Sequence, residues 1–372
     1  MIKLITSGES HGKALITVVN GIPANLTLNE NDINVELNRR RMGYGRGKRM
    51  QLEGEKAEIL SGVRKGKTIG SPIAISIWNK DWHKQIPQDI NIPRPGHADL
   101  AGALKYGQSD IRNIWERSSA RETAGRVAGA AVAKKLLKEF RIEILSHVIS
   151  IGVINAFSAQ DLSSASLKDK LKKLDPSKLR CVDKEKEKQM IRLIDKAKAE
   201  GDSLGGVFEV IVFGVPFGLG SYVQCDDRLD AKLAFALMSI PGIKGVEIGM
   251  GFEAARKFGS EVQDEIFYEK RKGFFHKTNN AGGIEGGISN AEPIILRAAM
   301  KPIPTLANPL RSVNLKTKKS SRAPVLRSDV CAVPAAGIVG EAMVAIEIAS
   351  AMKEKFGGDS TEEMKRNYNA KK

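Results

Sequence analysis

Residues 119–140 read SARETAGRVAGAAVAKKLLKEF. Ser119 and Glu122 have the S-x-x-E spacing of a capping box, which predicts that a helix begins here and runs to about Phe140. Alanine and glycine dominate the first half of the segment, and small side chains let a helix approach a neighbouring element closely. These residues therefore predict a long helix that packs tightly against another part of the fold.

Strands and other helices are expected on both sides of this segment. Ile73, Ile75 and Ile77 alternate with smaller residues, which is the period of a strand, and a helix over 29–41 has Asn31 or Asp32 near its cap. The other expected elements are strands at 57–63, 72–78 and 206–214, surface helix between 168 and 198, helices at 226–240 and 337–356, and a polar, frayed tail at 357–372. Because strands and helices mix without a regular β-α-β alternation, we expect an α+β fold in a single domain over residues 1–372.

The expected helix at 337–356 is largely apolar. Its isoleucine, valine and methionine side chains give it more hydrophobic surface than a solvent-facing helix shows. The pattern predicts a buried helix that also contributes to a subunit contact.

The composition is typical of a soluble globular protein, with 42% hydrophobic and 27% charged residues in 372. No apolar run approaches the roughly 20 residues of a membrane helix, and the N-terminus turns polar too soon for a signal peptide. Cys181, Cys225 and Cys331 lie far apart without a C-x-x-C motif, so neither a disulfide framework nor a cysteine zinc site is indicated. We expect a reducing, cytoplasmic location.

The chain carries 59 basic and 43 acidic residues, a net charge of +16. Such an excess favours anionic partners, and three explanations stay open: small anionic ligands, nucleic acid, or solubility alone. Aromatic residues are only 5%, and no nucleic-acid-binding signature is present. Arginines cluster among glycines at 39–49, where backbone N–H groups can approach a phosphate or carboxylate.

Two nucleotide-binding patterns are absent from the sequence. Residues 62–68 read GVRKGKT, with three residues between the glycines where a P-loop needs four, so a basic turn between two strands is expected instead. No G-x-G-x-x-G follows a strand, which argues against a Rossmann site.

Three other segments allow a structural and a functional interpretation. Arg117-Ser118-Ser119 precedes the predicted helix, where Ser119 either caps it or joins its neighbours in binding a phosphate at the helix N-terminus. Residues 279–290 are glycine-rich but contain apolar side chains, which favours a packed loop that meets a flat ligand. Two prolines stiffen Lys301-Pro302-Ile303-Pro304-Thr305 into an extended segment.

Histidines mark the candidate chemistry. The chain has five, and His11 and His97 lie in the glycine-containing motifs Gly8-Glu9-Ser10-His11-Gly12 and Arg94-Pro95-Gly96-His97-Ala98-Asp99. Histidine titrates close to cellular pH, so the two motifs indicate proton chemistry, together with the carboxylate of Arg327-Ser328-Asp329. His83, His147 and His276 are expected to be structural or exposed, and no histidine spacing predicts a metal site.

Taken together, these segments resemble the chorismate synthase family over nearly the whole chain, from Gly8 to about Glu341. The resemblance rests on the motifs at 8–12, 39–47, 94–99, 117–123, 279–287, 300–305 and 327–329. It implies a β-α-β sandwich with internal pseudo-symmetry, assembled as a homotetramer. It also implies a shikimate-pathway lyase that converts 5-enolpyruvylshikimate 3-phosphate to chorismate and phosphate by anti 1,4-elimination, using reduced FMN without net redox change.

The resemblance further implies roles for individual residues. His11 would protonate the departing phosphate, His97 would protonate the reduced flavin, and Ser10 with Asp329 would relay a proton at flavin N5. The implied cofactor-binding residues are Arg117, Ser118, Ser119, Pro241, Gly242, Gly286, Lys301, Pro302, Ile303, Pro304, Thr305 and Arg327 for FMN, and Arg40 and Arg46 for NADP, with NADPH as a flavin reductant. Pro241-Gly242 departs from the family's usual Asn-Ala or Asn-Gly.

Two alternatives to this function make different predictions. A basic RNA-binding protein without catalysis would bind nucleic acid with a steep salt dependence and ignore flavin. A flavin-dependent oxidoreductase would consume reductant in proportion to product. For the lyase we expect a small-molecule substrate, with no nucleic-acid or membrane partner.

Overall fold

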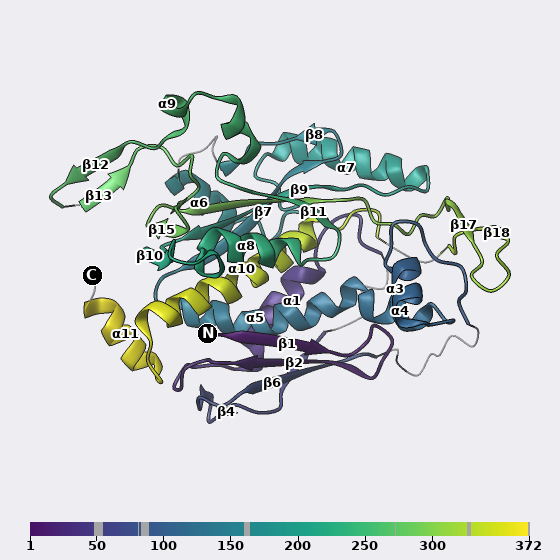
Figure 1. Ribbon diagram of the computed structural model, residues 1–372, viewed down its shortest axis with the longest axis horizontal. Helices are drawn as coiled ribbons and strands as arrows, with labels where there is room; N and C mark the ends of the chain where they lie inside the picture. Colours follow the sequence, from purple (N-terminus) through teal and green to yellow (C-terminus); the bar gives the residue numbers. More distant parts are fainter. Residues whose placement is uncertain are drawn as a thin grey trace.

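The computed structural model describes residues 1–47, 55–80, 82, 89–159, 164–271, 273–325 and 329–370. Two antiparallel sheets enclose a layer of helices (Figure 1). The N-terminal sheet has the order β1 (Lys3–Ser7), β2 (Ala14–Asn20), β6 (Ile73–Trp78), β3 (Ala57–Ile59). The second sheet has the order β11 (Ile243–Ile248), β16 (Ile294–Met300), β9 (Gly206–Phe213), β7 (Glu143–Ile151), β8 (Ile154–Asn155). The expected α+β sandwich is confirmed.

Four helices form the layer between the sheets: α1 (Glu30–Arg41), α5 (Thr123–Lys138), α8 (Leu229–Met238) and α10 (Val333–Phe356). Each half of the chain supplies one sheet and one long helix, and glycines set how closely the two pack. A Cβ on Gly129 would lie 2.3 Å from a Leu4 side-chain atom in the N-terminal sheet. A Cβ on Gly340 would lie 2.7 Å from the Phe208 ring in the second sheet. The tight packing predicted for residues 119–140 therefore occurs, and α10 repeats it in the other half.

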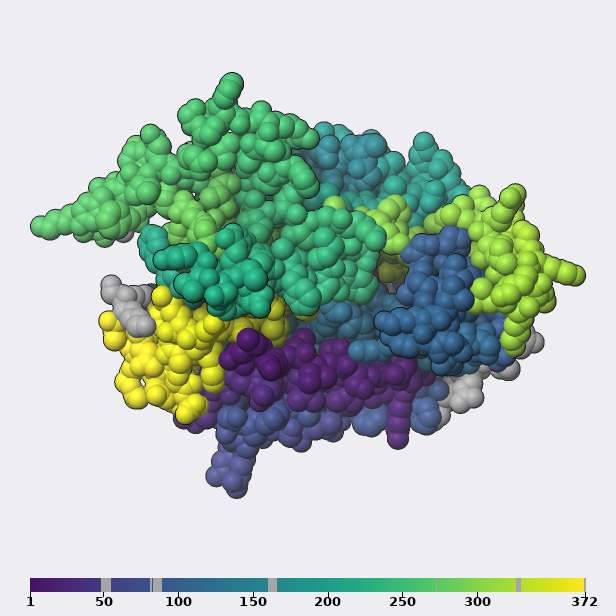
Figure 2. All heavy atoms as spheres, viewed as in Figure 1, coloured from purple at the N-terminus to yellow at the C-terminus, as the bar shows by residue number. Residues whose placement is uncertain are grey.

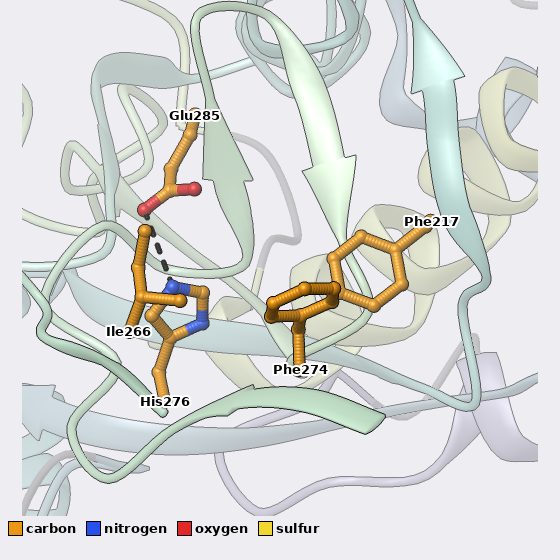
Figure 3. Close-up of a pocket in the computed structure, with 5 residues that line it drawn as sticks. All are labelled: Phe217, Ile266, Phe274, His276 and Glu285. Carbon is orange, nitrogen blue, oxygen red and sulfur yellow. Dashed lines mark ion pairs between the residues drawn. The ribbon is translucent and has the colours of Figure 1, made fainter. Parts of the chain in front are cut away.

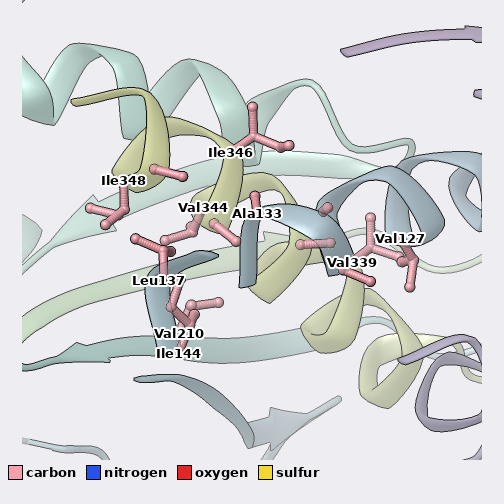
Figure 4. Close-up of a cluster of buried hydrophobic side chains, with 14 of the residues drawn as sticks. Val127, Ala133, Leu137, Ile144, Val210, Val339, Val344, Ile346 and Ile348 are labelled. Carbon is pink, nitrogen blue, oxygen red and sulfur yellow. The ribbon is translucent and has the colours of Figure 1, made fainter. Parts of the chain in front are cut away.

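The helical layer contains most of the hydrophobic core. Figure 4 shows Val127 and Leu137 of α5 meeting Val339 and Val344 of α10 above Val210 of β9. The helix Val333–Phe356 is long and apolar enough to cross a membrane by composition, yet 89% of its most apolar window is buried inside the protein. The prediction that α10 is buried is therefore confirmed. Its apolar surface is covered by α5, α8 and the second sheet of the same chain, so burial within the chain accounts for it and the predicted subunit contact stays a prediction.

The C-terminal segment differs from the expected frayed tail. Residues Thr361–Ala370 form α11, and Met364 is fully buried. The Tyr368 ring packs edge-on against Phe140 and Phe356, with ring centroids 5.3 and 5.1 Å away. Two large side chains four residues apart therefore anchor an otherwise polar helix.

Element boundaries follow local signals with some shifts. Helix α1 is capped by Asn29, whose side chain accepts from the N–H groups of Asn31 and Asp32, and Asp32 Oδ2 accepts from Asn29 N to close the capping box. The Ser119 capping box is not closed: Ser119 Oγ accepts from Arg121 N at 3.3 Å, while Glu122 pairs with Arg126. A 3-10 turn, η1 (Ala120–Glu122), therefore leads into α5.

Smaller elements complete the described chain. They are β4 (Val63–Arg64), β5 (Lys67–Thr68), α3 (Asp99–Tyr106), α4 (Arg112–Ser118), α6 (Ser164–Lys172), α7 (Lys184–Ala199), β10 (Phe217–Gly220), η3 (Cys225–Asp227), η4 (Gly251–Arg256), α9 (Gly259–Val262), β12 (Ile266–Glu269), β13 (Gly273–His276), β14 (Ile284–Glu285), β15 (Ile288–Asn290), β17 (Arg311–Val313) and β18 (Ser320–Arg322). The expected strand at 57–63 is split between β3 and β4, and the expected helix at 226–240 begins as η3 before α8. The basic segment at 62–68 is the β4–β5 hairpin, as expected. Figure 2 shows β12 and β13 projecting from the body as an arm.

Candidate active site

The turn that carries His11 follows β1 directly. Gly8 has φ +101°, and a Cβ there would lie 2.2 Å from Ala14 O, so only glycine fits. The Ser10 N–H donates to Glu116 O at 3.0 Å, and Arg117 Nη1 donates to Gly8 O at 3.0 Å. Two residues of helix α4, Glu116 and Arg117, therefore hold this turn in place.

The His11 ring is oriented by its neighbours. Its Nδ1 lies 2.9 Å from Ser10 Oγ, and its ring centroid is 5.9 Å from that of Trp115. Ser10 is buried, whereas the His11 side chain is half-buried. The contact with Ser10 fixes Nδ1 of the His11 ring, an arrangement compatible with proton transfer through the other ring nitrogen, Nε2.

The second histidine belongs to a compact ion cluster. Asp99 Oδ1 lies 2.5 Å from His97 Nδ1, and the Arg94 side chain donates to both Asp99 oxygens, at 2.8 and 3.0 Å. Burial of the Asp99 carboxyl opposes its ionisation, but hydrogen bonds and charge from His97 and Arg94 outweigh burial and hold its pKa well below the usual range. Asp99 is therefore a fixed anion that orients the His97 ring.

Trp115 connects the two histidine motifs. The Arg94 guanidinium carbon lies 5.0 Å from the Trp115 ring centroid, within the range of a cation–π contact. The indole contacts His11 and the guanidinium contacts His97. Helix α4, between α3 and the start of α5 in Figure 1, thus brings together two motifs that are 86 positions apart (97 − 11).

The proline-stiffened segment adjoins the His97 motif. Lys301 Nζ donates to Gly96 O, and Arg94 Nη1 donates to Thr305 Oγ1 at 3.1 Å. Lys301 N also donates to Gly242 O at 2.9 Å, which places Pro241-Gly242 beside this segment. Partial burial lowers the pKa of Lys301, and the nearby Lys244 ammonium adds to that effect. The structure therefore unites the residues 96–97, 241–242 and 301–305 that were singled out for a cofactor site.

Asp329 lies in a basic cluster that contains Arg40, at the end of α1, and Arg46, which follows that helix. Its Oδ2 is 2.7 Å from Arg46 Nη1, and its Oδ1 accepts from Gly47 N at 2.6 Å. Arg40 lies close enough to influence both charges, but its guanidinium is buried and donates to Thr123 Oγ1, Glu55 and Ala120 O. Arg40 thus joins the end of α1 to the start of α5, and in this structure its donors are directed to the protein.

Ser118 and Ser119 contact their own backbone. Ser118 Oγ donates to Ile114 O at 2.7 Å, and Ser119 Oγ accepts from Arg121 N. Arg117 is exposed and donates to Thr6 O and Gly8 O. These contacts match the structural interpretation of this segment and leave its phosphate-binding interpretation a prediction.

Comparisons with known proteins assign this chain to a family. The chorismate synthase family profile matches residues 2–352. The chain is 54% identical over 379 residues to "Chorismate synthase" of Alkaliphilus metalliredigens (strain QYMF), covering 99% of this chain and 98% of that protein. It is also 54% identical over 383 residues to "Chorismate synthase" of Aquifex aeolicus (strain VF5), covering 99% of this chain and 96% of that protein. A solved structure titled "Crystal Structure of Chorismate Synthase" superimposes with a TM-score of 0.84 at 48% identity, covering 100% of this chain and 97% of that one.

The chain belongs to the chorismate synthase family. It is therefore an enzyme, a lyase of the shikimate pathway that acts on a small-molecule substrate. Membership of the chorismate synthase family agrees with the motifs from which the resemblance was drawn.

Gly286 is not brought together with the other expected flavin residues. It lies in the β14–β15 turn, beyond the Ile294 end of β16, whereas Lys301 follows the Met300 end. The pocket beside it is formed by Phe217 of β10 and the β12–β13 arm, and Figure 3 shows His276 facing Glu285 there, 3.8 Å apart. Arg327, also expected to bind FMN, lies outside the described residues, as do Leu326 and Ser328.

The other predictions for polar residues can be compared with the structure. His147 is fully buried and lies 2.8 Å from Glu209, so its structural interpretation is confirmed. Within the described residues, no group of three or more histidine, cysteine or acidic side chains is arranged to hold a metal ion. The glycine-rich loop at 279–290 is packed: Asn279 Oδ1 accepts from Gly283 N, and Ser289 is buried.

Sequence reasoning missed several residues that build the site. Trp115, Asn79 and Glu55 were not singled out, although they contact or hold the residues that were. Each acts through contacts distant in sequence, so no local pattern marks them. Only Trp115, two positions before Arg117, stood next to a recognised motif.

Proposed function

We propose that this chain converts 5-enolpyruvylshikimate 3-phosphate to chorismate and phosphate by anti 1,4-elimination, with reduced FMN and no net redox change. The observation that carries the proposal is the joining of His11 and His97 through Trp115 and Arg94. Such an elimination must protonate a departing phosphate and remove a ring hydrogen, and two positioned histidines suit proton transfers near neutral pH.

The residues present fit anionic cofactors such as FMN and NADPH. Arg46 Nε is buried and has no hydrogen-bond partner among the described residues, although its Nη1 binds Asp329. A buried guanidinium N–H without a partner is costly, and a phosphate or carboxylate oxygen would satisfy it. Lys301 and the backbone of 301–305 would hold the flavin beside Gly242. When bound, reduced FMN would supply transient electron donation to the substrate and an N5 position that accepts hydrogen.

The chain's own residues would move the protons. His11, oriented by Ser10, would give its proton to the phosphate oxygen as the carbon–oxygen bond breaks. His97, fixed by Asp99, would hold a proton at the flavin. Asp329, whose carboxylate binds Arg46 Nη1 and accepts from Gly47 N, would exchange a proton with Ser10 near N5.

Several wider features belong to the same proposal. The assembly is a homotetramer, the location is cytoplasmic, and NADPH serves as a flavin reductant that Arg40 and Arg46 contact. The guanidinium of Arg40 is engaged by Thr123 and Glu55 and that of Arg46 is buried at Nε, so both contacts require a local rearrangement. The basic surface serves anionic small molecules and not nucleic acid.

An anaerobic assay tests the proposal. The chain is mixed with reduced FMN and 5-enolpyruvylshikimate 3-phosphate, and chorismate absorbance and reductant consumption are followed together. We expect many turnovers per flavin reduced. Stoichiometric loss of reductant would instead favour an oxidoreductase. Calorimetry with FMN should show binding that tightens with substrate, and tight, steeply salt-dependent RNA binding with no response to flavin would favour the RNA-binding alternative.

A further inference from the structure

Asn79 faces the turn that carries His11, and none of the roles above uses it. It follows the last residue of β6, is 5% exposed, and donates its backbone N–H to Lys13 O at 3.1 Å. The end of β6 is thereby fixed against the chain that follows the His11 turn.

The Asn79 side chain spans that turn. Its Nδ2 donates to Glu9 O at 3.1 Å and to Gly12 O at 2.8 Å. These carbonyls flank Ser10 and His11 on both sides, so one amide nitrogen ties together the two ends of the turn. A shift of Asn79 would therefore move the His11 backbone.

Arg121 fixes the opposite end of the amide. Asn79 Oδ1 accepts from Arg121 Nε at 3.1 Å and from Nη2 at 2.9 Å. A guanidinium only donates and a carbonyl oxygen only accepts, so the two ends of the amide cannot exchange places. An aspartate would satisfy Arg121 but not the two carbonyls, and the position therefore requires an amide.

Arg121 is itself held by a buried carboxylate. Glu55, which is 3% exposed, bridges Arg121 and Arg40, and Arg40 also binds the start of α5 through Thr123 Oγ1 at 3.0 Å. Arg40 is close enough to Arg46 and Asp329 to feel their charges. A chain of buried contacts thus connects the His11 turn to Arg40 and the start of α5, and Arg40 lies within electrostatic range of Arg46 and Asp329.

We propose that Asn79 is a positioning residue for His11, holding the imidazole where the departing phosphate takes its proton. The role of His11 as that proton donor rests on the proposed function; the holding of the turn does not.

Asn79→Asp is the informative variant because it keeps the acceptor for Arg121 and loses both donors to the turn. Asn367→Asp is a matched control. Asn367 lies in α11, and its Nδ2 donates to Phe356 O at the end of α10 at 2.8 Å, so the same kind of bond is lost away from the site. Asn79→Ala is the second variant, which removes both interactions without adding a charge.

Hydrogen exchange followed by mass spectrometry measures the holding directly. The amides of Ser10 and Gly12 are bonded in the structure, to Glu116 O and Glu9 O. We expect the peptide covering 8–13 to exchange faster in both Asn79 variants and to keep the wild-type rate in Asn367→Asp. Wild-type exchange at 8–13 in both Asn79 variants would overturn the inference, whatever the enzyme assay gives.

Kinetics then test the link to His11. We expect Asn79→Asp to lower kcat about 10- to 100-fold with KM little changed, since a misplaced catalytic group loses rate and not binding. In a His11→Ala background the same change should cost less than about 3-fold, because Asn79 acts through a group already removed. Independent, multiplicative losses would show that Asn79 acts elsewhere. A wild-type chain that makes no chorismate would overturn the proposed function, and the exchange rates would still decide whether Asn79 holds the turn.

Discussion

Arg46 Nη1 lies 2.7 Å from Asp329 Oδ2, which joins the arginine-rich segment after α1 to the segment before α10. Gly45 packs against Cys331 in the same region, and Val330 N donates to Gly45 O at 2.8 Å. The Asp329 carboxylate therefore has a positioning contact in addition to the proton relay proposed for it, and the two roles predict different consequences of mutation.

Asp329→Asn separates the two roles. The amide matches the carboxylate in size but accepts a proton far less readily, so we expect FMN and substrate to bind while turnover falls at least ~100-fold. Steady-state kinetics should show the loss in kcat and not in KM. Full turnover at saturating FMN, with weakened FMN binding, would make Asp329 a positioning residue for Arg46 and end the relay role.

Asp89→Asn is the control for that experiment. Asp89 pairs with Lys316 at 3.0 Å, and both side chains are more than half exposed. Exposed pairs of this kind contribute little, so turnover and folding should match the wild-type protein.

Local patterns predicted the helices and strands that depend on neighbouring residues. The alternation of Ile73, Ile75 and Ile77 marks β6 correctly because each of these side chains is buried on one face. Helix α11 was missed because its stability comes from Met364 and Tyr368 meeting residues far away in the chain. The Ser119 box failed because Glu122 has a competing partner, Arg126, one turn later.

The residues of the candidate site also fall into those that local sequence reveals and those that only distant contacts reveal. His11, His97 and Lys301 stand in unusual local contexts that a sequence displays. Asn79 and Trp115 have ordinary surroundings in the sequence, and only the folded chain brings them to the histidines. Gly286 also stands in a recognisable motif, but its turn lies beyond the Ile294 end of β16 in the same chain, and its role at the flavin stays a prediction.

Replacing the two histidines should lower turnover strongly. His11 is half-buried in a loop, so His11→Ala removes little packing, whereas His97→Ala also removes the contact with Asp99. We expect each to lower kcat roughly 10²- to 10⁴-fold, the usual contribution of a general acid or base, with thermal unfolding close to wild type for His11→Ala. His97→Ala should also lower stability, because it removes a hydrogen-bond partner of the buried Asp99 carboxylate. For His97→Ala the loss of turnover should follow the protonation state of the flavin. Near wild-type turnover from pH 6 to 8, roughly the histidine titration range, would remove the catalytic assignment.

Asp99→Asn should change how stability depends on pH. The folded-state pKa of Asp99 lies well below its usual value, so its contribution is complete above the unfolded pKa and is lost as pH falls. The gap in unfolding free energy between wild type and variant should be constant above about pH 5, then narrow by about 1.4 kcal/mol per pH unit below about pH 4. Urea unfolding between pH 3 and 7 measures this gap. A gap that stays the same at pH 3 and pH 7 would mean that Asp99 is not held ionised by Arg94 and His97.

Glu341 offers the sharpest test of stability. Its fully buried carboxylate lies 2.7 Å from Arg39 Nη1 and 2.6 Å from Lys134 Nζ, and it accepts from Ser146 Oγ at 2.7 Å. Burial opposes its ionisation, but Arg39, Lys134 and Arg180 outweigh burial and hold its pKa well below the usual range. One side chain of α10 therefore ties together α1, α5 and β7.

Glu341→Gln should destabilise the fold by roughly 3 to 5 kcal/mol, since it leaves buried cations without their shared anion. Glu185→Gln is the matched control: Glu185 pairs with Lys188 at 3.4 Å with both side chains 68% exposed, and its loss should cost less than about 1 kcal/mol. Urea unfolding at pH 7 compares the two. If Glu341→Gln costs no more than the control, then Glu36, which is 2.6 Å from Lys134 Nζ and 2.8 Å from Arg39 Nη1, is sufficient to neutralise these cations. The helical layer would in that case depend on its apolar contacts and not on the Glu341 carboxylate.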